Sequence, residues 1–134
     1  MIVVDTNVIA YALIQGAQTK TALNVYQKDS DWLVPELWRH EFLNVLALYV
    51  RQGGIDAADG RQTWRAATSL FDSSIRPVPM EDALQIAVDE SVSSYDAQFV
   101  ALAHSLQIQL VTEDRGLQRK FPGTAVSMRN FLAA

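Results

Sequence analysis

The sequence predicts an α/β protein in which helices cover both faces of a short central parallel sheet. Residues 2–4 are an unbroken run of β-branched side chains, which is typical of a strand buried on both faces. Further short apolar segments alternate with longer stretches whose apolar residues recur at helical spacing. Strands that alternate with helices favour a parallel sheet with right-handed connections. We therefore expect three layers, α/β/α.

The composition is that of one folded domain. The chain has 134 residues, of which 49% are hydrophobic and 19% charged, so we expect a single domain over residues 1–134. It contains no cysteine, which excludes disulfides and thiolate metal sites. The net charge of −4 argues weakly against nucleic-acid binding, which usually requires a basic surface. This argument does not hold if the acidic residues gather around a bound cation. Without a signal peptide or an apolar run of membrane length, we expect no membrane association and a cytoplasmic protein.

Two strands and four helices are expected in the first part of the chain. In order, they are a strand over residues 2–4, helices over about 7–16 and 19–28, a strand over 32–34, and helices over about 36–52 and 57–71. The long fifth element begins after Pro35, which is well tolerated at a helix start, and ends at Gly53 and Gly54. Asp56 is the expected N-cap of the helix that follows.

Three further strands are expected in the second part. In order, the elements are a strand over 75–79, helices over about 81–91 and 95–106, a strand over 108–111, a helix over about 114–120, a strand over 125–128 and a helical tail. Pro77 and Pro79 have no backbone N–H to donate, so we expect the strand over 75–79 to be short or to lie at a sheet edge.

Asp5 and Asp114 each follow a predicted strand and precede a helix. Ligands of open α/β sheets bind just outside the carboxyl ends of the strands, and parallel strands deliver those ends to one edge. We therefore expect both carboxylates at the same place. Each also has a structural explanation, because Asp is a favoured helix N-cap.

Glu41 and Asp96 are two further candidates. Glu41 lies in mid-helix, where capping cannot explain it, and three of its four helical neighbours are apolar. A carboxylate there needs a partner such as an arginine or a metal ion, unless it sits at a boundary and reaches water. Asn44, one turn further on, is placed to hydrogen-bond such a carboxylate. Asp96 lies in a first helical turn, and Ser93-x-x-Asp96 also resembles a capping box.

These acids indicate oxygen-ligand chemistry. His40 and His104 lie on separate predicted helices, without metal-ligand spacing. The chain has no glycine-rich phosphate loop and no nucleophile elbow. Three or four carboxylates without His or Cys ligands select Mg²⁺ or Mn²⁺ rather than zinc.

Four segments of the chain resemble a known family. They are Val3–Asn7, Glu36–Leu46, Tyr95–Ala103 and Leu110–Asp114. In this order and over the whole chain, they resemble the PIN-domain family, and in particular the small ribonuclease toxins of VapBC toxin–antitoxin systems. The resemblance implies a PIN-like α/β/α fold and Mg²⁺- or Mn²⁺-dependent endoribonuclease activity on RNA.

The resemblance also implies roles for individual residues. It places Asp5, Glu41, Asp96 and Asp114 in the family's acidic quartet, which binds metal and carries out catalysis. It places Asn7 and Thr112 at polar positions beside that quartet, where they support it as Asn44 would.

The chain departs from the family pattern at one position. Some members carry a further acid two residues past the one that matches Asp114, and here that position is Gly116. A second metal ion is then held weakly or only with substrate, and the neighbouring Glu113 replaces the acid only if its side chain turns to the site.

The resemblance further implies RNA as substrate, a homodimer, and a cognate antitoxin that lies in an apolar groove. Val8, Tyr11 and Trp32 are candidates for lining that groove or for the core. Arg39 and Arg115, near the acids in sequence, are candidates for binding RNA phosphates or are solvated surface charges.

Two other functions stay open at this point. A haloacid-dehalogenase-like phosphatase would use Asp5 as its nucleophile, but it needs a second Asp where this chain has Asn7. A non-catalytic binding or scaffold module on the same fold is the other alternative, since fold does not imply function.

Overall fold

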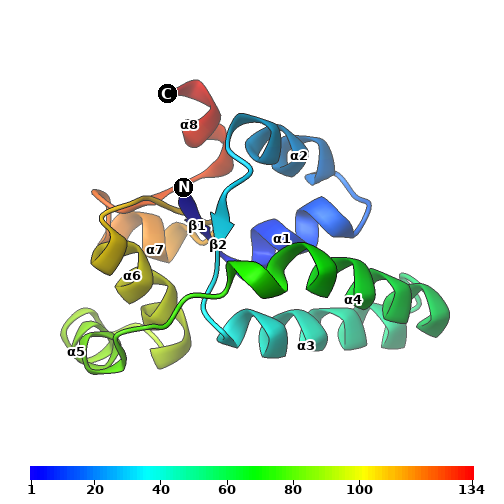
Figure 1. Cartoon of the computed structure of the whole chain (residues 1–134), viewed down its shortest axis with the longest axis horizontal. Coiled ribbons are helices and arrows are strands. Elements are labelled where there is room, and N and C mark those ends of the chain that lie inside the picture. Colours follow the sequence, from blue (N-terminus) through cyan, green and yellow to red (C-terminus); the bar gives the residue numbers. More distant parts are fainter.

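The computed structural model describes all 134 residues and confirms the α/β/α architecture (Figure 1). Its sheet is formed by β1 (Ile2–Val4), β2 (Trp32–Leu33), β3 (Leu110–Val111) and β4 (Ala125–Val126). All pairings are parallel and the strand order is β2-β1-β3-β4. The first strand of the chain is therefore central, and Val3 lies opposite both Leu33 and Leu110.

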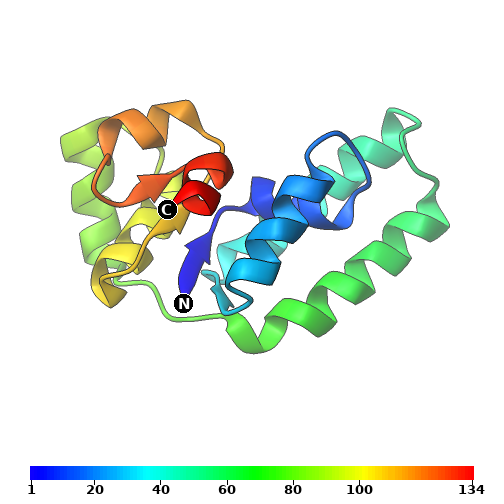
Figure 2. The same ribbon diagram turned by 90° about the horizontal axis from the view of Figure 1, so that it is seen from above.

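Eight α-helices and one 3₁₀ turn surround the sheet. They are α1 (Thr6–Leu13), α2 (Thr19–Lys28), α3 (Leu37–Arg51), α4 (Ala57–Phe71), the 3₁₀ turn η1 (Asp72–Ser74), α5 (Met80–Glu90), α6 (Ser94–Leu106), α7 (Arg115–Lys120) and α8 (Met128–Ala133). Figure 2 shows α5, α6 and α7 on one side of the strands and α1 to α4 on the other, with α3 and α4 extending beyond the sheet. None of these helices has the length and apolar character to cross a bilayer.

The two central strands, β1 and β3, lie in the middle of the hydrophobic core. Val3, Val4, Leu110 and Val111 have no exposed surface, which explains why their segments lack polar alternation. Helix α6 packs against both strands. The central strands are thus fixed, and with them the residues that follow each strand.

An aromatic cluster joins β2 to the long helices. Trp38 of α3 lies 5.7 Å from Phe71 and 6.3 Å from Trp64, both on α4, between ring centroids. Phe71 also stacks on Trp32 of β2 at 5.7 Å. Trp38 and Trp32 are almost completely buried, so this cluster holds α3, and with it Glu41, against the sheet.

The expected strand over residues 75–79 is absent. Val34 and Ile75 form one isolated parallel bridge, in which Val34 N donates to Ser74 O at 3.1 Å and Arg76 N donates to Val34 O at 2.9 Å. Pro77 and Pro79 then have no N–H to donate, so the ladder stops after a single bridge. The segment is a short extended connection to α5.

Candidate active site

Asp5 lies at the carboxyl end of β1 and is almost fully buried, with 8% of its surface exposed. Its Oδ1 accepts a hydrogen bond from Thr6 N at 2.8 Å, as expected of an N-cap of α1. Its Oδ2 accepts from Thr112 Oγ1 at 2.7 Å and lies 3.5 Å from Asn7 Nδ2. Capping therefore explains one carboxylate oxygen, while polar side chains surround the other.

Thr112 connects the ends of the two central strands. It is fully buried directly after β3, and its hydroxyl accepts a hydrogen bond from Asp114 N at 3.0 Å while it donates to Asp5. Asp114 Oδ1 in turn accepts from Leu117 N at 3.0 Å and caps α7. One threonine hydroxyl thus links the two acids that follow β1 and β3.

Glu41 projects from the middle of α3 and is half-buried. Its Oε1 accepts a hydrogen bond from Thr6 Oγ1 at 2.8 Å. Within the chain, the partner of this mid-helix carboxylate is therefore a hydroxyl at the start of α1, and not an arginine. The sequence-based prediction did not include Thr6 as a site residue, although Thr6 directly follows Asp5 at the predicted strand-to-helix junction.

Asp96 occupies the first turn of α6 and is half-buried. Its backbone N donates to Ser93 Oγ at 3.0 Å, so Ser93 is the N-cap of α6, which is one half of the expected capping box. The cap uses the backbone N of Asp96, and the Asp96 carboxylate interacts electrostatically with Asp114, Asp5 and Glu41.

Burial and the charges of neighbouring acids raise the pKa of three of the four carboxylates. Burial raises the pKa of Asp5 from 3.8 to about 6; hydrogen bonds from Thr112 and Thr6 oppose this rise, and the charges of Glu41 and Asp96 add to it. Burial, followed by the charge of Asp96, also raises the pKa of Glu41. Burial and the charge of Asp114 raise the pKa of Asp96. The acids are therefore close enough to repel each other.

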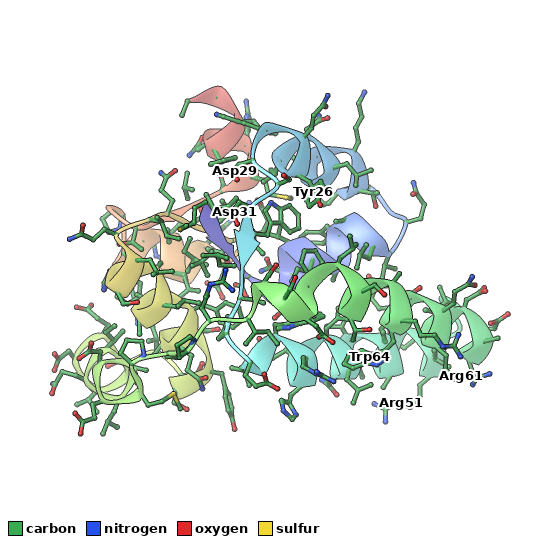
Figure 3. All side chains as sticks on the ribbon, viewed as in Figure 1. Tyr26, Asp29, Asp31, Arg51, Arg61 and Trp64 are labelled. Atoms are coloured by element: carbon green, nitrogen blue, oxygen red, sulfur yellow. The ribbon has the colours of Figure 1, made fainter.

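No basic side chain forms an ion pair with these four acids. The ion pairs of the chain join the N-terminal ammonium group to Asp29 and Asp31, which are labelled in Figure 3, and Arg39 to Asp72. The repulsion among the four carboxylates is therefore not offset by a cation of the chain. A buried carboxylate in such a cluster is stabilised by any cation that enters.

The residues fit a divalent metal ion by their chemistry. As positioned, no three Asp, Glu or His side chains are grouped closely enough to hold one ion together. The available donors are nevertheless all oxygens, which is what Mg²⁺ and Mn²⁺ prefer. The Oδ1 atom of Asn7 beside Asp5 is buried without a hydrogen-bond partner, which fits a further polar ligand or ion there.

The remaining candidates lie in different places. Arg115 is exposed at the start of α7, next to Asp114. Arg39 instead faces α4, with Nη1 3.5 Å from Asp72 Oδ1 and its guanidinium 5.7 Å from the Trp64 ring centroid. Asn44 is exposed and lines a hollow with Glu41 rather than contacting it through a hydrogen bond.

Glu113 does not take the place of the missing acid. Its Oε1 accepts from Met128 N at 2.7 Å, so the side chain turns to the start of α8. A Cβ atom at Gly116 would lie 3.0 Å from Asp114 Oδ1, so a side chain there would crowd that carboxylate.

Two of the three groove candidates belong to the core. Val8 has no exposed surface and Trp32 only 1%, whereas Tyr11 is half-buried and packs against the core. Any groove for a partner therefore lies elsewhere or uses Tyr11 alone among the three.

Comparison with known proteins confirms the family resemblance. Residues 2–121 match the sequence profile of the PIN domain. Ribonuclease VapC3 of Pyrobaculum aerophilum is 30% identical over 125 residues, 90% of this chain and 95% of the relative. VapC ribonuclease Mb0985 of Mycobacterium bovis is 30% identical over 119 residues, 85% and 86% of the two chains. Exonuclease VapC9 of P. aerophilum is 32% identical over 84 residues, 63% and 62% of the two chains.

Solved structures agree on the fold. The crystal structure of PAE2754 from P. aerophilum superposes with a TM-score of 0.78 at 23% identity, over 98% of this chain and 93% of that one. The crystal structure of FitAcB from Neisseria gonorrhoeae gives a TM-score of 0.71 at 16% identity, over 96% and 99%.

Proposed function

Because the chain belongs to the PIN-domain family, we propose that it is a divalent-metal-dependent endoribonuclease and the toxin of a toxin–antitoxin pair that acts in the cytoplasm. The observation that carries the proposal is the cluster formed by Asp5, Glu41, Asp96 and Asp114. Burial and the charges of neighbouring acids raise the pKa of Asp5, Glu41 and Asp96, and no cationic side chain of the chain forms an ion pair with them. The names of the relatives support RNA as the substrate.

Asp5, Glu41, Asp96 and Asp114 would hold Mg²⁺ or Mn²⁺. When bound, such an ion lowers the pKa of a water molecule and polarises the phosphate, which promotes hydrolysis to a 5′-phosphate and a 3′-hydroxyl. The chain itself fixes the carboxylates beforehand. Burial of Asp5 excludes bulk water from its side chain, which strengthens its interaction with a cation.

Threonine hydroxyls and helix ends position these acids. Thr112 donates to Asp5 and Thr6 donates to Glu41, so each carboxylate keeps one oxygen oriented by a short hydrogen bond. Asp114 is oriented by Leu117 N at the start of α7. Groups that orient metal ligands in this way commonly contribute 10- to 100-fold to metal affinity or activity.

Product analysis tests the hydrolysis. We expect the chain to cut a circular single-stranded RNA in the presence of Mn²⁺, to stop in EDTA, and to leave 5′-phosphate ends. A circle has no end for an exonuclease, so cleavage of linear RNA alone would favour the activity named for the P. aerophilum relative VapC9. RNA binding without cleavage in any metal would favour the scaffold alternative.

We propose that the antitoxin binds in the hollow between α3 and α4. It has a volume of about 400 Å³ and is lined mainly by apolar side chains, with Trp64, Arg51 and Arg61 around it (Figure 3). An apolar segment that carries acidic residues would match both its surface and its charge.

We also propose a homodimer. Met80, Leu84 and Val88 recur every four residues on α5 and are each more than half exposed, forming an apolar stripe on that helix. Light scattering on the wild type and on Leu84→Glu tests this surface. We expect a dimer for the former and a monomer for the latter; a monomeric wild type would contradict the proposal.

A further inference from the structure

We infer that a hollow beside the four acids, lined by Tyr95, His40 and Asn44, is a subsite for one nucleobase of the RNA. This inference rests on the proposed ribonuclease function and names the part of the substrate that the chain would recognise. The hollow has a volume of about 380 Å³ and is lined by Leu37, His40, Glu41, Asn44 and Tyr95. Pockets of this size are within the range that holds small organic groups.

The α3 wall of the hollow is a consequence of helical spacing. Leu37, His40, Glu41 and Asn44 follow one another at three, one and three positions, so they lie on one face of α3. Tyr95 faces them from the first turn of α6, directly before Asp96. Glu41 therefore belongs both to the acidic cluster and to the hollow, and the two are adjacent.

The exposure of Tyr95 has no explanation in core packing. The side chain is 59% exposed, whereas Trp38, Phe42 and Phe99 of α3 and α6 are buried, and the other exposed aromatic side chain of these helices, Tyr49, does not line the hollow. An exposed aromatic ring beside a phosphate-cleaving site offers a face on which a base can stack, which is how single-stranded nucleic acids are commonly held.

The opposite wall supplies polar contacts. His40 and Asn44 are exposed on α3, and neither appears in a side-chain hydrogen bond with the rest of the chain. An amide and an imidazole can each donate to and accept from the edge of a base. A ring on one side and two hydrogen-bonding groups on the other suit a nucleobase better than the apolar side chain of a protein partner.

Equilibrium binding tests the subsite without requiring cleavage. We would measure fluorescence anisotropy of a labelled oligoadenylate and of an abasic oligomer of the same length, with Ca²⁺ present to support binding without turnover. For the wild type we expect the oligoadenylate to bind roughly 5- to 100-fold more tightly, the range that stacking of one base supports. Tyr95→Ala should lose most of this preference, and Tyr95→Phe should keep it.

Tyr49→Ala is the matched control, because Tyr49 is also exposed but lies in the last turns of α3, away from the hollow. It should bind both oligomers like the wild type. Asn44→Ala should change the ratio of oligoadenylate to oligouridylate binding, since Asn44 would contact the edge of the base rather than its face.

The outcomes separate this inference from the proposed function. If Tyr95→Ala keeps the wild-type preference for the oligoadenylate, the subsite is refuted, whether or not the chain cleaves RNA. If Tyr95→Ala changes only the oligomeric state in light scattering, the residue belongs to a protein interface and the subsite is likewise refuted. A Tyr95-dependent preference in a chain that never cleaves RNA would support the subsite and refute the nuclease.

Discussion

Thr6 Oγ1 donates a hydrogen bond to Glu41 Oε1 over 2.8 Å, across 35 positions of sequence. The backbone N of the same threonine donates to Asp5, so Thr6 contacts two of the four acids. We expect Thr6→Val to weaken Mn²⁺ binding and RNA cleavage by about 10- to 100-fold, because Glu41 loses the hydroxyl that orients it. Thr6→Ser keeps a hydroxyl and should stay near the wild type. Equal Mn²⁺ affinity and cleavage rate for the valine and serine variants would show that the Thr6–Glu41 hydrogen bond contributes to neither.

Thr112→Val should affect both stability and activity. Thr112 Oγ1 donates to the buried Asp5 carboxylate and accepts from Asp114 N. Its loss should lower the free energy of unfolding by about 1.5 to 3 kcal/mol near neutral pH, the range for a hydrogen bond to a charged group. Urea denaturation measures this change. Thr21→Val, on the partly exposed surface of α2, is the control and should have little effect.

Stability of the metal-free chain should depend on pH through Asp5. Burial raises the pKa of Asp5 to about 6 in the folded state, against 3.8 ordinarily. Between these values the folded state binds the proton that the unfolded state has released, so the stability contributed by Asp5 falls as pH rises through about 6. Above that pH the penalty approaches about 3 kcal/mol.

Asp5→Asn removes this penalty. Without metal we expect it to raise the free energy of unfolding at pH 8 by up to about 3 kcal/mol, and by roughly half as much at pH 5. Urea denaturation in EDTA at the two pH values checks this. An asparagine variant that is less stable than the wild type at pH 8 would contradict the electrostatic account of the cluster.

The arginines beside the hollow between α3 and α4 should affect partner binding alone. Arg51 and Arg61 are exposed and line this hollow. In the double variant Arg51→Glu, Arg61→Glu, binding of the cognate antitoxin should weaken at least tenfold through charge repulsion, while RNA cleavage stays unchanged. Calorimetry with the antitoxin, together with a cleavage assay, measures both. Unchanged antitoxin binding would place the partner elsewhere.

The sequence was most informative where chemistry and chain position coincide. Asp5 and Asp114 follow the two central strands, and the rule that ligands bind at strand ends was enough to predict that both lie at one edge of the sheet, where Thr112 links them. Glu41 stood out because no local structural role explains a carboxylate in mid-helix. Both arguments use only neighbouring residues.

The contacts that remained hidden depend on how distant segments pack. The Thr6–Glu41 bond requires α1 and α3 to be adjacent, which no local pattern encodes. Arg39 lies two residues from Glu41 on the helix and so points to α4 instead of the acids. The strand expected over residues 75–79 does not form, because Pro77 and Pro79 prevent the pairing from extending beyond one bridge.

The central claim is that the four acids bind a divalent metal ion and that RNA cleavage depends on this ion. The most direct measurement is Mn²⁺ binding by calorimetry for the wild type, Asp5→Asn and Glu41→Gln, with RNA cleavage measured in parallel. Glu36→Gln, an exposed acid just before α3, is the control. We expect Asp5→Asn and Glu41→Gln to lose both binding and cleavage and Glu36→Gln to keep both. Normal Mn²⁺ binding and cleavage by Glu41→Gln, or no Mn²⁺ binding by the wild type even with RNA present, would contradict the account.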